Sequence, residues 1–231
     1  MKKLTSFLGL SLCLTALAPA AVVTFTGGTA YGNLTIFDPV TWMPTTVTSG
    51  VTDGTQNFSG VDYYIENGFK FDYVGGSGGS IGNYYGTGND VIHAHWGVSE
   101  MTGIEISKDG GGTFEFNYFV LTSNTLNPGG APTGAEDVHV QAWLNGVQVG
   151  SDVILPSEQW GFPAVDIFFG TAFDNVDKVV ITSTHTSFSC FGMDSFYIDQ
   201  AAPVSPSVPE PSALSLLALG LGGLAAVRRR K

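Results

Sequence analysis

The stretch Asp137-Val138-His139-Val140-Gln141-Ala142-Trp143-Leu144-Asn145-Gly146-Val147-Gln148-Val149 decides the fold class of this 231-residue chain. Apolar and polar residues alternate on both sides of Asn145-Gly146, and a period of two is typical of a half-buried β-strand. An Asn-Gly pair suits a type I′ turn, because both central residues of that turn need a positive φ. The stretch therefore predicts a β-hairpin. Trp143 stands in a strong strand, and we expect its large ring to lie in the core.

The same alternation recurs between clusters of Gly, Asn, Asp and Pro. Two stretches each predict three aromatic rings on one face: Phe69, Phe71 and Tyr73 in 68–74, and Phe114, Phe116 and Tyr118 in 113–120. Further strands are expected at 22–25, 34–37, 91–95, 103–107, 164–169, 179–182 and 195–198. About ten strands without helical crossovers predict an all-β antiparallel sandwich, and we expect a jelly-roll-like arrangement.

Two segments of the chain predict loops. Residues 41–60 are rich in Thr, Ser and Gly, and residues 75–90 are dominated by Gly, Ser, Asn and Tyr. Loops of this length are often functional or mobile.

The ends of the chain predict targeting segments around a single β-sandwich domain at 21–200. Residues 1–20 have a positive start, an apolar helical stretch and small residues at Ala18 and Ala20, as a secretory signal peptide has. Residues 201–207 predict a short linker, and 208–231 a separate C-terminal signal with one hydrophobic helix. The apolar run 213–227 would be about 22 Å long as a helix, against the roughly 30 Å of a bilayer core. It therefore predicts a marginal, transient span of the inner membrane.

Charge narrows the classes of partner. Residues 21–207 carry three lysines, no arginine and nineteen acids, a net charge of −16. Nothing in this composition would neutralise phosphates, so we expect no nucleic-acid partner. Metal cations, neutral glycans and cationic partners stay open.

The C-terminus contains Pro209-Glu210-Pro211, then a Gly- and Leu-rich apolar run, then Arg228-Arg229-Arg230-Lys231. This three-part order resembles the PEP-CTERM sorting signal of Gram-negative bacteria. The resemblance implies export to the cell surface or beyond, recognition and cleavage by an exosortase-type membrane enzyme, and association with exopolysaccharide or biofilm. The alternative is an ordinary C-terminal anchor, and whether the tail is cut or retained stays open.

The body carries a second resemblance. Tyr64-Ile65-Glu66-Asn67-Gly68-Phe69 and Met193-Asp194-Ser195-Phe196-Tyr197-Ile198-Asp199 are similar to motifs of jelly-roll carbohydrate-binding modules. This resemblance implies a structural calcium ion between Glu66 and either Asp194 or Asp199. Calcium prefers the oxygen ligands that an acidic chain with Gly-, Asn- and Asp-rich loops offers. The alternative is that these acids form a solvated surface.

Glycan binding requires exposed aromatic rings on which sugars can stack. Five aromatic residues stand in or beside expected loops: Trp42, Tyr84, Tyr85, Trp96 and Trp160. Of these we expect Tyr84, Tyr85, Trp96 and Trp160 to be the candidate ligand-binding residues. Large aromatic residues are mostly core residues, so burial is the alternative for each.

Three further side chains have metal- or thiol-based chemistry. His93 and His95 are two residues apart on an expected strand, so they share a face and could bind a metal such as Zn²⁺. They could equally form the polar face of a half-buried strand. Cys190 is the only cysteine left once the signal peptide is removed, and we expect a buried thiol, with an intermolecular disulfide as the alternative.

These observations predict an exported, non-catalytic cell-surface or extracellular-matrix protein. A calcium-dependent carbohydrate-binding module is the alternative, and a glycoside hydrolase is a third hypothesis. We expect no catalytic residues, because the sequence lacks the E-x-D-x-x-E strand motif of jelly-roll glucanases.

Overall fold

A computed structural model of the chain describes residues 20–38, 40–48, 50–52, 57–75, 78–83, 90–95, 101–127, 130–159, 164–183 and 190–204. The described residues form strands and one 3-10 turn. The strands are β1 (Ala21–Val23), β2 (Thr29–Phe37), β3 (Pro44–Thr48), β4 (Val51–Thr52), β5 (Asn57–Glu66), β6 (Phe69–Val74), β7 (Gly79–Gly82), β8 (Val91–His95), β9 (Gly103–Lys108), β10 (Phe116–Thr125), β11 (Val138–Leu144), β12 (Val147–Ile154), β13 (Val165–Phe168), β14 (Lys178–Ser183) and β15 (Cys190–Ile198). The 3-10 turn is η1 (Thr171–Phe173).

All pairings between these strands are antiparallel, which confirms the all-β antiparallel prediction. The hydrogen-bonded order is β12-β11-β14-β9-β6-β5-β7-β8-β15-β10-β13, with β1 paired to β15 and β2 paired to β3, β4 and β5. Only some neighbours are consecutive in sequence, so the sheet depends on long-range pairing.

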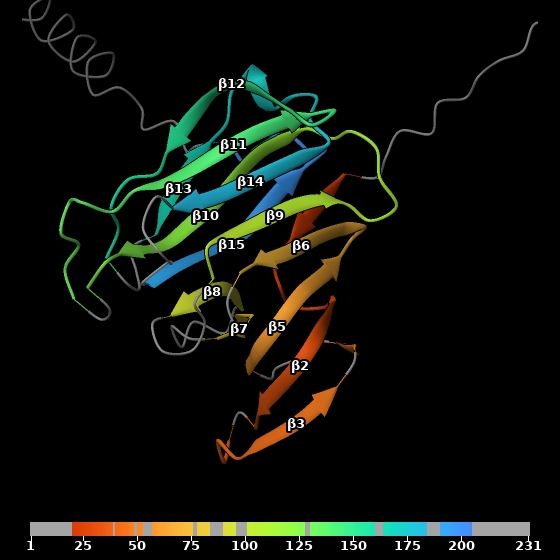
Figure 1. The fold of residues 1–231 in the computed structure, drawn as a ribbon, viewed down its shortest axis with the longest axis vertical. Helices are drawn as coiled ribbons and strands as arrows, with labels where there is room; N and C mark the ends of the chain where they lie inside the picture. The colour runs from red at the N-terminus through yellow and green to blue at the C-terminus, as the bar shows by residue number, and fades with distance from the viewer. Residues whose placement is uncertain are drawn as a thin grey trace, which may run out of the picture. The chain divides into compact units, whose positions relative to one another are not determined.

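The sheet curls so that two parts of it face each other. We call β12, β11, β14, β9, β6, β5 and β2 the front layer and β7, β8, β15, β10 and β13 the back layer; Figure 1 shows β14 and β9 in front of β10 and β15. Phe71 of β6 and Phe196 of β15 meet edge to face between the layers, with ring centroids 5.0 Å apart. Phe25 lies 5.1 Å from Phe71 and 5.6 Å from Phe196. The core therefore lies between the two layers.

The local predictions from alternation and turn chemistry hold in β6 and in the β11–β12 hairpin. Phe69, Phe71 and Tyr73 are all buried in the core. Asn145 and Gly146 have φ values of 52° and 76°, as a turn with two positive φ values requires.

The predicted face of Tyr118 is wrong. Phe114 and Phe116 belong to the core, but Tyr118 packs against Phe168, with ring centroids 5.1 Å apart, and donates its hydroxyl to Asp166. The β10–β15 register shifts between Phe116 and Tyr118 and again before Val120. Such a bulge changes which side chains face inward, and Phe119 takes the core position instead.

The two expected loops contain strands. Residues 41–60 include β3, β4 and the start of β5, and residues 75–90 include β7. β3 is a Thr-rich edge strand paired to β2, and β7 lies between β5 and β8. Gly, Ser and Thr predict loops from local preference, whereas these segments gain their conformation from neighbouring strands.

The chain forms two compact units, Met1–Ala201 and Ala202–Lys231. The expected signal helix and the expected C-terminal helix lie outside the described residues. Among the residues that are described, no helix has the length and apolar character to cross a membrane.

Candidate functional site

Glu66, an expected calcium ligand, binds backbone amides at the end of β1. Its Oε2 accepts a hydrogen bond from the Phe25 amide at 2.8 Å, and its Oε1 accepts one from the Thr24 amide at 3.3 Å. Burial raises the pKa of Glu66, and these hydrogen bonds oppose the rise. The carboxylate therefore joins β5 to the chain that follows β1.

Asp194 and Asp199, the other expected calcium ligands, lie on β15 and directly after it. Asp199 accepts the Glu115 amide at 2.9 Å and forms an ion pair with Lys108 at 2.7 Å. Asp194 is buried opposite Val120, and its Oδ1 accepts the Ser195 amide at 2.6 Å. In the described parts of the chain, no three His, Cys, Asp or Glu side chains gather as a metal site. Calcium binding stays a prediction.

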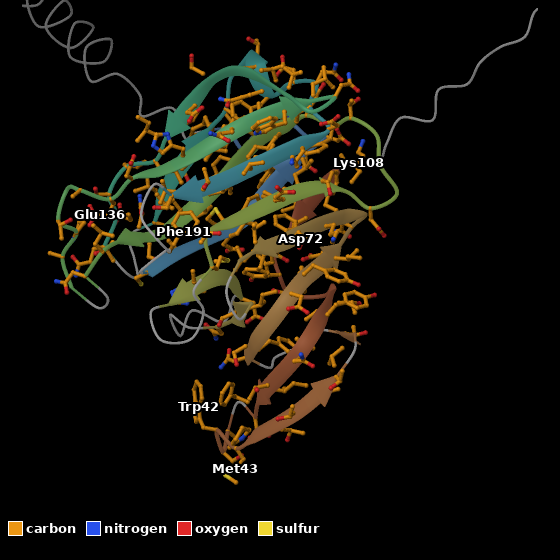
Figure 2. The ribbon with its side chains drawn as sticks, viewed as in Figure 1. Trp42, Met43, Asp72, Lys108, Glu136 and Phe191 are labelled. Carbon is orange, nitrogen blue, oxygen red and sulfur yellow. The ribbon has the colours of Figure 1, made fainter. Side chains whose placement is uncertain are left out.

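The expected aromatic ligand-binding residues Tyr84, Tyr85, Trp96 and Trp160 lie outside the described residues, as do Ala18, Pro209, Glu210, Pro211 and Arg228, Arg229 and Arg230. Ala20 is described and exposed. Trp42 is also described. It lies in the turn between β2 and β3 and is 59 % exposed; Figure 2 shows it with Met43 at the end of that hairpin.

Trp143 is not in the core, contrary to our expectation. Val138, Val140 and Ala142 of the same strand are buried, so the strand period turns Trp143 to the opposite face, where it is half-buried. The Lys178 ammonium lies 5.5 Å from the centre of its ring, and its Nε1 donates to Gln141 Oε1 at 3.4 Å. An indole ring is therefore accessible on a described sheet face.

Trp143 belongs to a broad polar and aromatic surface, which we call the outer face. It is the side of the front layer that points away from the core, and its half-buried residues include Tyr31, Tyr63, Lys70, Asp72, Glu105, Gln141, Trp143 and Lys178. Six residues on six neighbouring strands are successive cross-strand partners and form one row across this face. They are Gln141, Val180, Glu105, Asp72, Tyr63 and Tyr31. Core residues alternate with them on the same strands: Ala30, Tyr64, Phe71, Ile106, Val179 and Ala142.

A pair of tyrosines occupies one end of this row. The rings of Tyr31 and Tyr63 stack with centroids 4.6 Å apart and planes 13° from parallel. Lys70 lies over the Tyr63 ring at 4.6 Å and also pairs with Asp72. The tyrosines are therefore held in fixed orientations beside charged hydrogen-bonding groups.

A hydrogen-bonded cluster continues the outer face at β11 and β12. His139 contacts Asp137 through Nε2 at 2.6 Å and Asp152 through Nδ1 at 3.1 Å. Asp152 also accepts from Gln141 at 3.1 Å and from Gln148. The hydrogen bond from Gln141 is the largest cause of a lowered pKa at Asp152. Amides, carboxylates and an imidazole thus lie next to Trp143, which is joined to the cluster through Gln141.

Comparison with known proteins identifies the C-terminal segment. The family model of the PEP-CTERM protein-sorting motif matches residues 207–231. The chain carries a PEP-CTERM sorting motif. This motif implies export, sorting to the cell surface in Gram-negative bacteria and processing by an exosortase, as the sequence analysis predicted. A search of curated proteins finds no match.

Two solved structures have a distant likeness to the body. One is a mutant of the family 29 carbohydrate-binding module CBM29-2, with 12 % identity, coverage of 62 % of this chain and 90 % of that chain, and a TM-score of 0.35. The other is an isomalto-dextranase of Arthrobacter globiformis complexed with panose, with 13 % identity, coverage of 79 % of this chain and 33 % of that chain, and a TM-score of 0.24. At these TM-scores neither likeness carries an argument about function.

Proposed function

We propose that this exported protein is a non-catalytic surface or matrix protein that binds a neutral polysaccharide on its outer face. The curled antiparallel sheet, which we assign to the jelly-roll-like sandwiches, serves as the scaffold. The half-buried Trp143 ring beside the Gln141 amide is the observation that carries the proposal.

The chemistry of the outer face suits sugars. Pyranose rings have apolar C–H faces that pack on flat aromatic rings, and their hydroxyls need donors and acceptors close by. Trp143 and the Tyr31–Tyr63 pair supply rings at two separated places on one row of strands. Gln141, Glu105 and Asp72 stand between them. A polymer that spans several strands could contact both aromatic places.

The charge distribution favours a neutral polymer over an anionic one. Lys70 and Lys178 are ion-paired with Asp72 and Glu105, and residues 21–207 contain only one further cationic side chain apart from histidine, Lys108. An anionic chain would meet a body of net charge −16 with its ammonium groups already neutralised.

A hydrolytic role is the alternative that needs a direct test. Asp72 and Glu105 are partners in the β6–β9 register, and glycosidases use two carboxyl groups. Each of these carboxylates has a lysine partner, and the two lie on a sheet face. We therefore propose that they bind rather than cleave.

The test is a pull-down of the full chain, purified in mild detergent, on insoluble neutral polysaccharides together with a glycan array. We expect Trp143→Ala to weaken binding at least tenfold and the matched control Trp42→Ala to leave it unchanged. Samples with EDTA, and with calcium restored, test the expected calcium dependence. Release of reducing ends is assayed in parallel, with an Asp72→Asn/Glu105→Gln variant as its control.

Equal binding by Trp143→Ala and the unaltered protein would reject the outer face as the site. Absence of binding to every glycan would reject carbohydrate binding and leave a surface or matrix protein without that activity. Reducing ends released by the unaltered protein but not by the carboxylate variant would replace the proposal with a hydrolase.

A further inference from the structure

The back layer brings a thiol and an imidazole together. Cys190 Sγ, at the start of β15, lies 3.8 Å from His93 Nε2 on β8. Both residues are 1 % exposed and they are 97 positions apart in sequence. The outer-face chemistry of the front layer does not use either residue.

The strand registers explain the approach. Cys190 is opposite His95, and Gly192 is opposite His93. Because Gly192 has no side chain, no bulky group stands between the His93 ring and the neighbouring thiol. Gly192 and Cys190 are two residues apart on one strand, so the strand period assigns the position of His93 to the face that carries Cys190.

A buried hydroxyl beside this pair points to a ligand. Ser80 is opposite His93 in the β7–β8 register and is 1 % exposed. Its Oγ has no hydrogen-bond partner among the described residues. Leaving a buried hydroxyl unsatisfied is unfavourable, and a bound ion with a coordinated water would give it a partner.

We propose that Cys190 and His93 bind a transition-metal ion of the Zn²⁺ class. Zinc takes thiolate sulfur at about 2.3 Å and imidazole nitrogen at about 2.0–2.1 Å in tetrahedral geometry. Those lengths set the sulfur and nitrogen about 3.6 Å apart, close to the 3.8 Å observed between Sγ and Nε2. On binding, the thiol proton leaves to solvent as the sulfur–metal bond forms. Water molecules, one of them near Ser80, would complete the coordination.

This site is independent of polysaccharide binding, so either proposal can fail alone. The test uses the full chain with Cys13→Ser, which leaves Cys190 as the only thiol, and titrates it with Co²⁺. We expect one Co²⁺ per chain, with a thiolate-to-cobalt charge-transfer band in the near ultraviolet and visible bands of tetrahedral intensity. Added Zn²⁺ should displace the cobalt and remove both.

The variants separate the ligands. Cys190→Ser should abolish the charge-transfer band, and His93→Gln should weaken cobalt affinity at least tenfold. His139→Gln is the matched control, because His139 lies on β11 in the front layer, and it should bind as the parent does. Circular dichroism of each variant reports whether it folds.

Absence of a charge-transfer band in the folded parent would overturn the proposal, whatever the variants do. A band that survives Cys190→Ser, or affinity unchanged by His93→Gln, would also overturn it.

Discussion

Lys178 Nζ lies 5.5 Å from the centre of the Trp143 ring, and the same ammonium is 3.3 Å from Glu105 Oε1. The other two lysines of residues 21–207 repeat this arrangement. Lys70 covers Tyr63 and pairs with Asp72, and Lys108 lies 5.9 Å from the Phe69 ring and pairs with Asp199. Each lysine thus has an aromatic ring and an acid as neighbours, and the remaining charge of the body is negative.

Polysaccharide binding should therefore be nearly independent of salt. The lysines have local partners, and a neutral ligand brings no charge to be screened. Raising the ionic strength from about 0.05 M to 0.5 M shortens the Debye length severalfold, yet we expect the dissociation constant to change less than twofold. Binding measured across a salt series checks this. A steep loss of affinity at high salt would indicate a charged ligand.

Alternation along single strands predicted much of this fold. Phe69, Phe71 and Tyr73 are inward as expected, and Asn145-Gly146 forms the expected turn. The same alternation also determines that Trp143 faces outward once Ala142 is inward. Sequence reasoning placed Trp143 in the core because it gave more weight to ring size than to strand parity.

Other features could not be predicted because they depend on distant strands. The bulge that turns Tyr118 to the sheet face opposite the core exists only against β15, and β7 takes its strand conformation between β5 and β8. Likewise, the contact between Cys190 and His93 joins residues that no local pattern connects. Glu66, which a motif suggested as a calcium ligand, accepts the Phe25 amide across a separation of 41 residues, and its calcium binding stays a prediction.

Glu136 fixes the segment between β10 and β11, and its loss should be costly. Its carboxylate accepts from Ser157 Oγ at 2.6 Å, from Thr133 N at 2.7 Å, from Gly134 N at 2.8 Å and from Leu126 N at 3.1 Å. We expect Glu136→Gln to lower the free energy of unfolding by about 1–3 kcal/mol, since an amide cannot accept all of these donors. Urea denaturation measures it, with the exposed Glu115→Gln as a control of near-zero effect.

The effect of Glu136 should depend on pH. Burial acts to raise the pKa of Glu136, but the hydrogen bonds from Ser157, Thr133 and Leu126 outweigh it and hold the pKa well below its ordinary range. A carboxyl group with a lowered folded pKa stabilises the fold above its unfolded pKa, and this stabilisation is lost as the pH falls towards the folded value. The gap between the parent and Glu136→Gln should shrink below about pH 4. A gap that is constant from neutral pH to pH 3 would contradict this assignment.

Trp42 adopts a left-handed backbone conformation that a bulky residue rarely takes. Its φ is 56°, the residue is 59 % exposed, and its amide donates to the Asp38 carbonyl at 2.9 Å. For residues other than glycine this conformation costs roughly 1–2 kcal/mol. We expect Trp42→Gly to be as stable as the parent or up to about 1 kcal/mol more stable, and Trp42→Ala to gain less. Thermal unfolding of the three proteins compares them, and a loss of stability in Trp42→Gly would mean that the ring packs on the hairpin.

Asp90, just before β8, should make the fold less stable as the pH rises through the weakly acidic range. The residue is 4 % exposed, its Oδ2 has no hydrogen-bond partner among the described residues, and burial raises its pKa to about 6. Between the ordinary pKa of aspartate and pH 6 the folded chain holds a proton that the unfolded chain has released, so stability falls as the pH rises from about 4 to 6.

Asp90→Asn removes the ionisation, and we expect it to be about 1–3 kcal/mol more stable than the parent at pH 7. Near pH 4 the two proteins should be about equal, because the parent is protonated there. Urea denaturation of both proteins at several pH values checks the sign, and an Asp90→Asn protein that is less stable at pH 7 would mean that the charged carboxylate has a stabilising partner.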